Sequence, residues 1–268
     1  MRADRLRLLA VLALALWMIL PILPLAVWSF AYGWRFPDLL PQDWSLRAWS
    51  FALSGQSGIL ESFALTTLIA LATTFLSALI GVPAGRALGL YRFRGKGLVT
   101  LLFLAPAVVP GIAITFGLHG IFLRLGLAGT VTGVILAHLV PVVPYMTLVM
   151  AAVFSRFDPD LEAQARSLGA TPWQTFRAVT LPAILPGLLT AALFAFLVSW
   201  SQYLLTLAIG GGRVQTLPLL LFSFASAGRN DITGAVGLLY ILPGLMVLIL
   251  TARQVTGRGA ALAGGLRP

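Results

Sequence analysis

Side chains that could do chemistry are sparse in this sequence, and their spacing does not fit catalysis. The chain has no cysteine, which excludes disulfides, thiolate nucleophiles and thiolate metal sites. Its two histidines, His119 and His138, stand apart, whereas a metal site needs three or four ligands at close spacing. No Ser/His/Asp arrangement and no pair of carboxylates stands out within the apolar segments. We therefore expect no catalytic residue, no bound metal and no cofactor, and we interpret both histidines as core or interface residues.

A small polar cluster lies mid-way along one long apolar segment. Gln202 and Tyr203 lie three and four residues after Ser199. A continuous helix would therefore place these three residues on one face and turn Ser201 away from it. Hydrogen-bonding groups at mid-membrane depth are costly unless they are used, and transporters tend to place solute sites at this depth. The three residues are therefore candidates for a translocation path. The alternative is that Ser and Gln join neighbouring helices by hydrogen bonds.

The elements that must position these residues are membrane-spanning helices. Of the 268 residues, 59% are hydrophobic and 10% charged, where a soluble domain has about 25% charged residues. Six segments are long and free of charge, and each exceeds the roughly 20 residues that cross the hydrocarbon core. They are residues 8–34, 62–85, 97–123, 125–155, 182–210 and 232–252. The sequence predicts an all-α polytopic membrane protein, a single domain over residues 1–268 with six transmembrane helices.

Two further segments need their own interpretation. Residues 1–31 begin with basic residues like a signal peptide, but the apolar run is longer than the usual h-region of about 7 to 15 residues. An uncleaved first helix is the better interpretation. The charge-free segment 214–228 is short and contains Pro218, so it fits an interfacial or re-entrant segment.

The distribution of basic residues predicts the orientation of the chain. A six-helix chain places 13 of the 18 Lys and Arg residues on one side of the membrane and five on the other. Because cytoplasmic loops carry the excess of Lys and Arg, both termini are predicted to be cytoplasmic. The net charge of +10 is thus explained by orientation, and nucleic acid is not expected as a partner.

The loop between the fourth and fifth predicted spans, residues 156–181, has the pattern of two short helices. Glu162 lies four residues before Arg166, the favourable order for an ion pair on an exposed helix face, which is worth a few tenths of a kcal/mol. Gly169 supplies the end of this first helix. An apolar stripe at helical spacing comprises Phe157, Leu161, Ala165 or Gln164, and Leu168.

A second short helix is predicted directly after Gly169. Thr171 is placed as its N-cap, Pro172 as its first residue, and Gln174 can reach back to form a capping box. An exposed amphipathic helix needs a partner that covers its apolar stripe. The alternative is a helix that lies on lipid headgroups.

The segment from Asp158 to Pro182, DPDLEAQARSLGATPWQTFRAVTLP, resembles the EAA loop of inner-membrane permease subunits of binding-protein-dependent (type I) ABC importers. The family pattern is Glu-Ala-Ala, three residues, Gly, nine residues, Ile, one residue, Leu-Pro. It falls here on Ala163, Gln164, Ala165, Gly169, Val179, Leu181 and Pro182. Ala163 occupies the family's glutamate position, and Glu162 stands one residue earlier. The resemblance covers essentially the whole chain.

The resemblance implies a transport subunit of the bacterial inner membrane that is surrounded by lipid. Its implied partners are a pair of cytoplasmic ATP-binding subunits, a second permease subunit and an extracytoplasmic solute-binding protein. Its implied ATPase-coupling residues are Glu162, Ala163, Gln164, Ala165, Arg166, Gly169, Ala170, Thr171 and Pro172. The sequence has no GxxxxGK[ST] motif, so ATP hydrolysis is expected in the partner and not in this chain.

The expected solute is a polyamine or a similar small polar or ionic molecule. Leu168, before the coupling glycine, resembles the spermidine/putrescine and inorganic-ion branch, whereas sugar-type permeases often have Asp there. The predicted spans contain no Asp or Glu, so Glu61 and Asp231 at the external edge, with the rings of Trp200 and Tyr203, are the groups that could meet a cation. The alternatives are a sugar-type ABC importer and, from another class, a secondary transporter driven by an ion gradient. The latter normally places ionisable residues inside the membrane.

Overall fold

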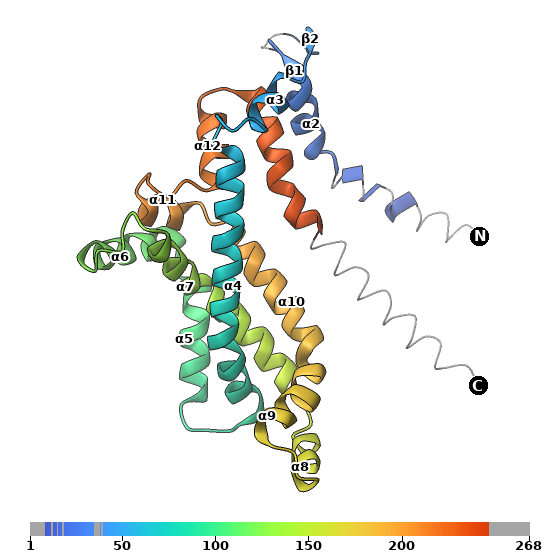
Figure 1. Ribbon diagram of the computed structural model, residues 1–268, viewed down its shortest axis with the longest axis vertical. Helices are drawn as coiled ribbons and strands as arrows, with labels where there is room; N and C mark the ends of the chain where they lie inside the picture. Colours follow the sequence, from blue (N-terminus) through green and yellow to red (C-terminus); the bar gives the residue numbers. More distant parts are fainter. Residues whose placement is uncertain are drawn as a thin grey trace. The chain divides into compact units, whose positions relative to one another are not determined.

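Helices form most of the structure, because apolar segments without charge satisfy their backbone groups internally only as helices. The computed structural model describes residues 9–11, 13–14, 16–17, 19–34, 38 and 40–246 (Figure 1). The chain divides into two compact units, which we call unit 1 and unit 2. Unit 1 combines Met1–Ala64 with Thr216–Pro268, and unit 2 is Leu65–Gln215.

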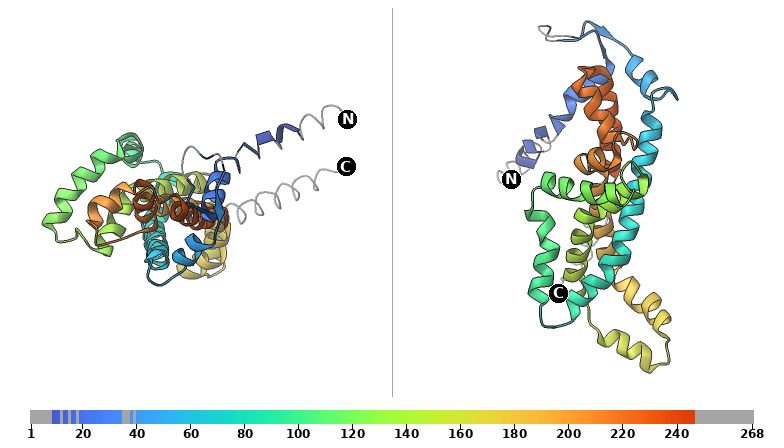
Figure 2. Two further views of the ribbon diagram at one scale, coloured as in Figure 1. Left: turned by 90° about the horizontal axis from the view of Figure 1, so that it is seen from above. Right: turned by 90° about the vertical axis from the view of Figure 1, so that its left-hand side faces the viewer.

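Unit 2 is a set of helices joined by short connections. Its elements in chain order are α4 (Ile59–Leu90, from residue 65 on), α5 (Lys96–Val108), α6 (Gly111–Arg124), α7 (Val131–Phe154), α8 (Asp160–Ser167), α9 (Pro172–Thr175), the π-helix η1 (Phe176–Thr180), α10 (Leu181–Trp200) and α11 (Leu204–Gly210). The short helices α8 and α9 project from the end of this unit where α7 ends and α10 begins (Figures 1 and 2).

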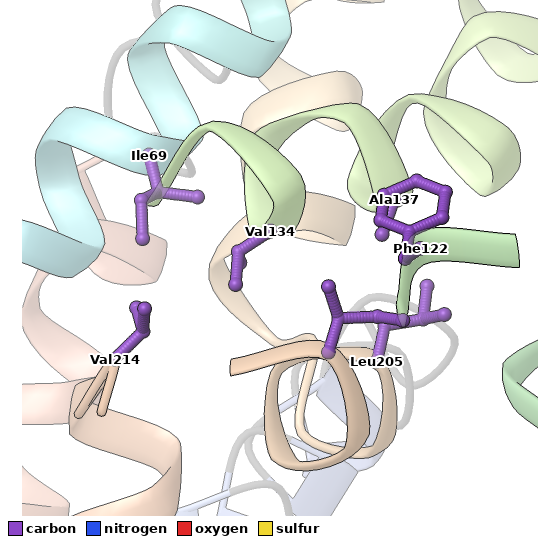
Figure 3. Close-up of a cluster of buried hydrophobic side chains, with 7 residues drawn as sticks. Ile69, Phe122, Val134, Ala137, Leu205 and Val214 are labelled. Carbon is purple, nitrogen blue, oxygen red and sulfur yellow. The ribbon is translucent and has the colours of Figure 1, made fainter. Parts of the chain in front are cut away.

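Helix α7 carries the two hydrophobic clusters of unit 2. The first joins α4, α6, α7 and α11 and consists of Ile69, Phe122, Val134, Ala137, Leu205, Ile209 and Val214 (Figure 3). The second joins α7 to α10 and consists of Val142, Met146, Met150, Phe154, Ile184, Ala191 and Ala195. Because α7 contributes residues to both clusters along its length, it is the element that connects them.

Unit 1 contains the segments on either side of unit 2 in the sequence. Its described elements are α2 (Ile22–Phe30), the antiparallel pair β1 (Ala31–Tyr32) and β2 (Asp43–Trp44), α3 (Arg47–Ala52), the first turns of α4, α12 (Leu217–Ser226) and a helical stretch over residues 230–246. The last stretch packs closely on α2, since a Cβ at Gly234 would lie 2.6 Å from the carbonyl oxygen of Leu25. The rings of Phe51 and Phe224 join α3 to α12 at a centroid distance of 6.2 Å.

The six predicted spans are confirmed only in part. Within the described residues, three helices are long and apolar enough to cross a membrane: α4, α7 and the continuous stretch Pro172–Trp200. A bent pair built from α5 and α6 would make a fourth span. The predicted spans 8–34 and 232–252 extend into residues outside the described part of the chain. Helix α12 is short and apolar, in agreement with the short segment predicted at 214–228.

The predicted span over residues 97–123 is not one straight helix. The helix breaks between α5 and α6, whose axes are bent by 94°. Val109 has an extended backbone (ψ 131°) and precedes Pro110, which also leaves the helical region (ψ 130°). Proline disfavours helical geometry at the preceding residue and has no N–H to donate, so the chain turns here.

The predicted span 182–210 is also interrupted. Helix α10 ends at Trp200 and α11 begins at Leu204, so Ser201, Gln202 and Tyr203 form a break between them. The expected single helix face shared by Ser199, Gln202 and Tyr203 therefore does not exist.

A row of glycines on α4 sets its distance from α7. Cβ atoms added to Gly81, Gly85 and Gly89 would lie 2.5 to 2.6 Å from side-chain carbons of α7. These residues are four apart, so one face of α4 is flat enough for direct contact between the two backbones. Small residues at this spacing are typical of helices that pack closely in membranes.

We expect Gly85→Ala to destabilise the protein, because the added methyl would lie 2.5 Å from the Cβ of Met150 and 2.9 Å from the backbone nitrogen of Ala151. Overpacking of this kind costs about 1–3 kcal/mol. The thermal unfolding midpoint of the detergent-purified chain should fall. Gly97→Ala, whose methyl meets nothing within 4 Å, should leave the midpoint unchanged or raise it slightly through helix propensity. Equal midpoints for the two variants would contradict the close packing of α4 and α7.

Candidate functional site: the loop between α7 and α10

The loop between α7 and α10 is anchored by an ion pair whose carboxylate is buried. Arg86 of α4 donates from Nη1 to Oε1 of Glu162 at 2.7 Å and from Nη2 to Oε2 at 2.6 Å. Thr180, the last residue of η1, donates its hydroxyl to the same Oε1 at 2.6 Å. Glu162 is only 5% exposed. One carboxylate thus joins α8 to α4 and to the start of α10.

This geometry corrects the expectation of an exposed Glu162. Arg166 does lie near Glu162, with 3.6 Å between Nη2 and Oε2, but it is the more distant and more exposed of the two cations. A bidentate guanidinium–carboxylate pair in a buried position is much stronger than a pair on a solvated helix face. The spacing of charges along α8 indicates only Arg166, because helical spacing relates residues of the same helix and Arg86 lies on another one.

The electrostatics follow from the hydrogen bonds. Donation from Arg86, assisted by the hydroxyl of Thr180, lowers the pKa of Glu162 from 4.5 to about 2, although burial acts in the opposite direction. The carboxylate is therefore ionised at every physiological pH. Arg86 also lies over the ring of Phe154, with 5.8 Å from Cζ to the ring centroid, so its planar group is held on two sides.

The predicted end of α8 at Gly169 is confirmed. Gly169 has φ +89°, the left-handed region that favours glycine. Its N–H donates to the carbonyl of Arg166 at 2.9 Å, and the N–H of Ala170 donates to that of Ala165 at 3.1 Å. These two bonds are the Schellman motif, which satisfies carbonyls at a helix end and reverses the chain.

The predicted capping box of α9 is confirmed as well. The N–H of Gln174 donates to Thr171 Oγ1 at 3.3 Å, and the N–H of Thr171 donates to Gln174 Oε1 at 2.8 Å. Pro172 occupies the first turn, where no N–H is needed. Both ends of the sharp turn between α8 and α9 are therefore set by local residues.

The outer side of the two short helices presents apolar groups to the surroundings. Leu168 is 90% exposed at the turn, and Trp173, stacked on Phe176 at 5.7 Å, is 66% exposed. Asp160, Ala163, Gln164, Ser167 and Leu168 line a shallow cavity of about 550 Å³. The predicted apolar stripe is divided, because Phe157 turns inward onto Phe154, with 6.0 Å between ring centroids, whereas Leu161 stays exposed.

The candidate path residues lie at the break between α10 and α11. Ser199 is 2% exposed, and its Oγ lies 2.9 Å from Nδ1 of His138. Gln202 and Tyr203 are half-buried, and Ser201, which a continuous helix would turn away from them, is exposed at the surface of the chain. Ser199 thus joins two helices, as the alternative interpretation proposed, and His138 is a buried residue between them, as expected.

A second cavity, of about 760 Å³, lies within unit 1. It is lined by Trp28, Ala31, Tyr32, Gly33, Trp34, Asp38, Arg47, Gly228, Arg229, Asn230 and Asp231. Arg47 donates to the hydroxyl of Tyr32 at 2.9 Å and lies over its ring at 5.2 Å. Arg229 pairs with Asp231 at 3.5 Å. Of the external groups named from the sequence, Asp231 reaches this cavity and Glu61 does not line it.

Two residues of the loop anchor were missed by sequence reasoning. They are Arg86, which in the sequence is one of the basic residues that predict the orientation in the membrane, and Thr180, which no motif marks. The signal that could have found Arg86 is the glycine spacing around it, since Gly85 and Gly89 bring this turn of α4 against the end of α7, from which the loop begins. Nothing in the local sequence marks Thr180, because its role depends on the π-helix that turns it toward Glu162.

The chain is similar to known permease proteins of transport systems. A family model described as "Binding-protein-dependent transport system inner membrane component" matches residues 81–256. The trehalose transport system permease protein SugB of Mycobacterium tuberculosis is 30% identical over 192 residues, 70% of each chain. The putrescine transport system permease protein PotI of Escherichia coli is 30% identical over 211 residues, 73% of this chain and 74% of PotI.

A solved structure agrees with the fold. One chain of a bacterial ABC transporter involved in the import of the acidic polysaccharide alginate superimposes with a TM-score of 0.69 and 20% sequence identity. The match covers 94% of the present chain and 98% of that chain. The likeness shows a shared fold.

We expect Glu162→Gln to destabilise the loop and the protein, since it removes a charge that Arg86 binds in a buried position. The lowered pKa corresponds to a stabilisation on the order of 3 kcal/mol. The measurement is the thermal unfolding midpoint in detergent at pH 7. Asp160→Asn, which removes the same charge from an exposed position in the first turn of α8, is the matched control and should change the midpoint little.

The same variant gives a pH signature. A carboxylate with a lowered pKa contributes its stabilisation above its unfolded value and loses it as pH falls toward the folded value. The difference in midpoint between wild type and Glu162→Gln should therefore be constant from pH 8 to about 5 and shrink between 4.5 and about 2. A difference that disappears already between pH 8 and 6 would show that Glu162 is not held by Arg86.

Proposed function

Because the chain belongs to the family of binding-protein-dependent transport system inner membrane components, and is a permease subunit of an ABC importer, we propose that residues 156–181 couple it to an ATP-binding subunit. The observation that carries this proposal is the α8–α9 turn. It exposes Leu168 and Trp173 at its outer side while Glu162 ties its inner side to α4. A loop that is rigidly held inside and apolar outside fits a docking element.

The anchor suggests how a movement of the loop reaches the helices. Glu162 joins α8 to Arg86 of α4, and the hydroxyl of Thr180 joins it to η1, which continues into α10. A displacement of α8 by a bound ATPase would therefore act on both α4 and α10 at once. Buried charge-assisted hydrogen bonds resist separation, so they transmit such a displacement as a rigid link.

The remaining partners and the orientation follow from the family and the charge distribution. We infer an assembly with a pair of ATP-binding subunits, a second permease subunit and an extracytoplasmic solute-binding protein. The excess of Lys and Arg on the loop side favours an inner-membrane protein with both termini in the cytoplasm.

The proposed solute is a polyamine or a similar small polar or ionic molecule. PotI, 30% identical, is named for putrescine, and Leu168 before Gly169 fits the same branch. The cavity of unit 1 does not decide between solutes, because its two aspartates, Asp38 and Asp231, are accompanied by two arginines, Arg47 and Arg229. SugB, named for trehalose, is equally identical, so a sugar is the second candidate.

Uptake into proteoliposomes that contain the full complex separates these candidates. We expect ATP-dependent accumulation of labelled putrescine that unlabelled spermidine inhibits and trehalose does not. Accumulation of trehalose in place of putrescine would identify a sugar-type importer. Uptake that survives ATP depletion but stops when ionophores collapse the ion gradient would contradict the importer mechanism itself.

Coupling through the turn is tested by Gly169→Asp. A side chain at φ +89° costs on the order of 1 kcal/mol and misaligns α8 with α9, so the co-expressed ATP-binding subunit should no longer co-purify with the inserted chain. Gly95→Asp is the matched control, because Gly95 has φ +85° in a different loop and a Cβ there meets nothing within 4 Å.

A second variant removes apolar contact without backbone strain. Leu168→Lys changes a side chain that is already 90% exposed, so it should preserve folding and still reduce ATPase co-purification. Normal co-purification with both Gly169→Asp and Leu168→Lys would contradict the proposed docking element.

A further inference from the structure

A chain of buried hydrogen bonds crosses the break between α10 and α11. His138 of α7 is 1% exposed, and its two ring nitrogens contact one hydroxyl on each side of the break. Nδ1 lies 2.9 Å from Oγ of Ser199, in the last turn of α10. Nε2 lies 2.9 Å from Oγ1 of Thr206, in the first turn of α11. Ser199 and Thr206 are as deeply buried as the histidine.

The hydrogen-bond directions follow from the number of protons available. The hydroxyl of Thr206 donates its one proton to the backbone carbonyl of Gln202 at 2.9 Å, so toward His138 it can only accept. Nε2 of His138 therefore carries the ring proton and donates it to Thr206. Nδ1 is then the acceptor, and the hydroxyl of Ser199 donates to it. A neutral imidazole in the Nε2–H form satisfies every group of this chain.

Local sequence does not explain the break itself. Residues 199–206 contain neither Gly nor Pro, the residues that usually interrupt a helix. At the end of α10, the N–H of Ser201 donates to the carbonyl of Leu197 at 3.1 Å, and the N–H of Gln202 donates to the carbonyl of Ser199 at 3.2 Å. The carbonyl of Gln202 is satisfied by the hydroxyl of Thr206, which His138 also binds. Interrupted helices in membranes need such compensation from neighbouring side chains.

We propose that His138 is a positioning residue that holds α10 and α11 at a fixed angle and thereby keeps Gln202 and Tyr203 at the break in the geometry that solute meets. The proposal rests on the function as an importer and on the candidate translocation path that the sequence predicts, of which Gln202 and Tyr203 remain at the break. His138 acts through the backbone of the break, since it binds the hydroxyl that fixes the carbonyl of Gln202. It need not touch solute.

Substitutions can remove the two contacts separately. In His138→Asn, the side-chain amide lies at the position of the imidazole Nδ1 and keeps the contact with Ser199. In His138→Gln, the longer side chain brings its amide to the position of Nε2 and keeps the contact with Thr206. Ser199→Ala removes the first contact from the other side, and Thr206→Val removes the second contact together with the bond to the carbonyl of Gln202. We expect His138→Gln to resemble Ser199→Ala. We expect His138→Asn to act like Thr206→Val through the contact that both lose, with Thr206→Val at least as severe because it also removes the bond to Gln202.

The readout is the reactivity of single cysteines introduced at 201, 202 and 203 in a chain that has none of its own. The complete importer in proteoliposomes is treated with a water-soluble thiol reagent. In the otherwise wild-type chain, Gln202→Cys and Tyr203→Cys should react and be protected by putrescine, or by trehalose if the uptake assay identifies a sugar importer. Adding Thr206→Val or His138→Asn should change their rates roughly fivefold, the effect of about one buried hydrogen bond, and adding His138→Gln should change them less. The exposed Ser201→Cys is the control and should keep its rate.

A second readout separates positioning from general stability. The concentration of putrescine, or of trehalose if that is the transported solute, that gives half-maximal uptake should rise in His138→Asn and Thr206→Val, while the ATPase still co-purifies and its basal hydrolysis persists. Unchanged cysteine rates together with a lower unfolding midpoint would mean that His138 only stabilises the core, and would overturn the proposal. Cysteines at 202 and 203 that are inert in every background would overturn both the path and the role of His138, while coupling through Gly169 would still stand.

Discussion

The bidentate bond between Glu162 and Arg86 is the interaction on which the α8–α9 loop depends. A carboxylate removed from water is stabilised only if both oxygens find donors, and here Arg86 and Thr180 supply three hydrogen bonds. These donors come from α4 and η1, so the loop is placed by elements distant in sequence. Without them, α8 would be a short, polar helix with little to hold it, because most helical stability in proteins comes from packing.

The ion pair in turn requires the close packing of α4 on α7. Gly81, Gly85 and Gly89 allow the two backbones to approach, which brings Arg86 over Phe154 and next to the point where the loop leaves α7. The glycines and the salt bridge are thus parts of one arrangement. Apolar contact fixes the distance between helices, and the charge pair fixes the loop that follows.

Polar groups inside the helices follow the same physical rule. In α4 the hydroxyl of Thr74 donates to the carbonyl of Ala70 at 2.7 Å, and that of Ser77 donates to the carbonyl of Thr74 at 2.8 Å. Hydroxyls in apolar surroundings that return to their own helix cost little. At the break between α10 and α11, where the helix cannot supply all its bonds, His138 and Thr206 take over. Irregular backbone in a membrane protein is found where side chains supply the hydrogen bonds that the helix lacks.

The sequence by itself determined the features that depend on neighbouring residues. Gly169 ends α8 because it can adopt positive φ, Thr171 and Gln174 form the capping box, and charge-free segments become helices. The spacing across the loop was enough to indicate the family. Only the tertiary structure decided that Glu162 is buried on Arg86 and that Ser201 to Tyr203 form a break between α10 and α11. Those outcomes depend on partners 61 to 76 residues away in the chain, and a helical pattern reports only which residues share a face.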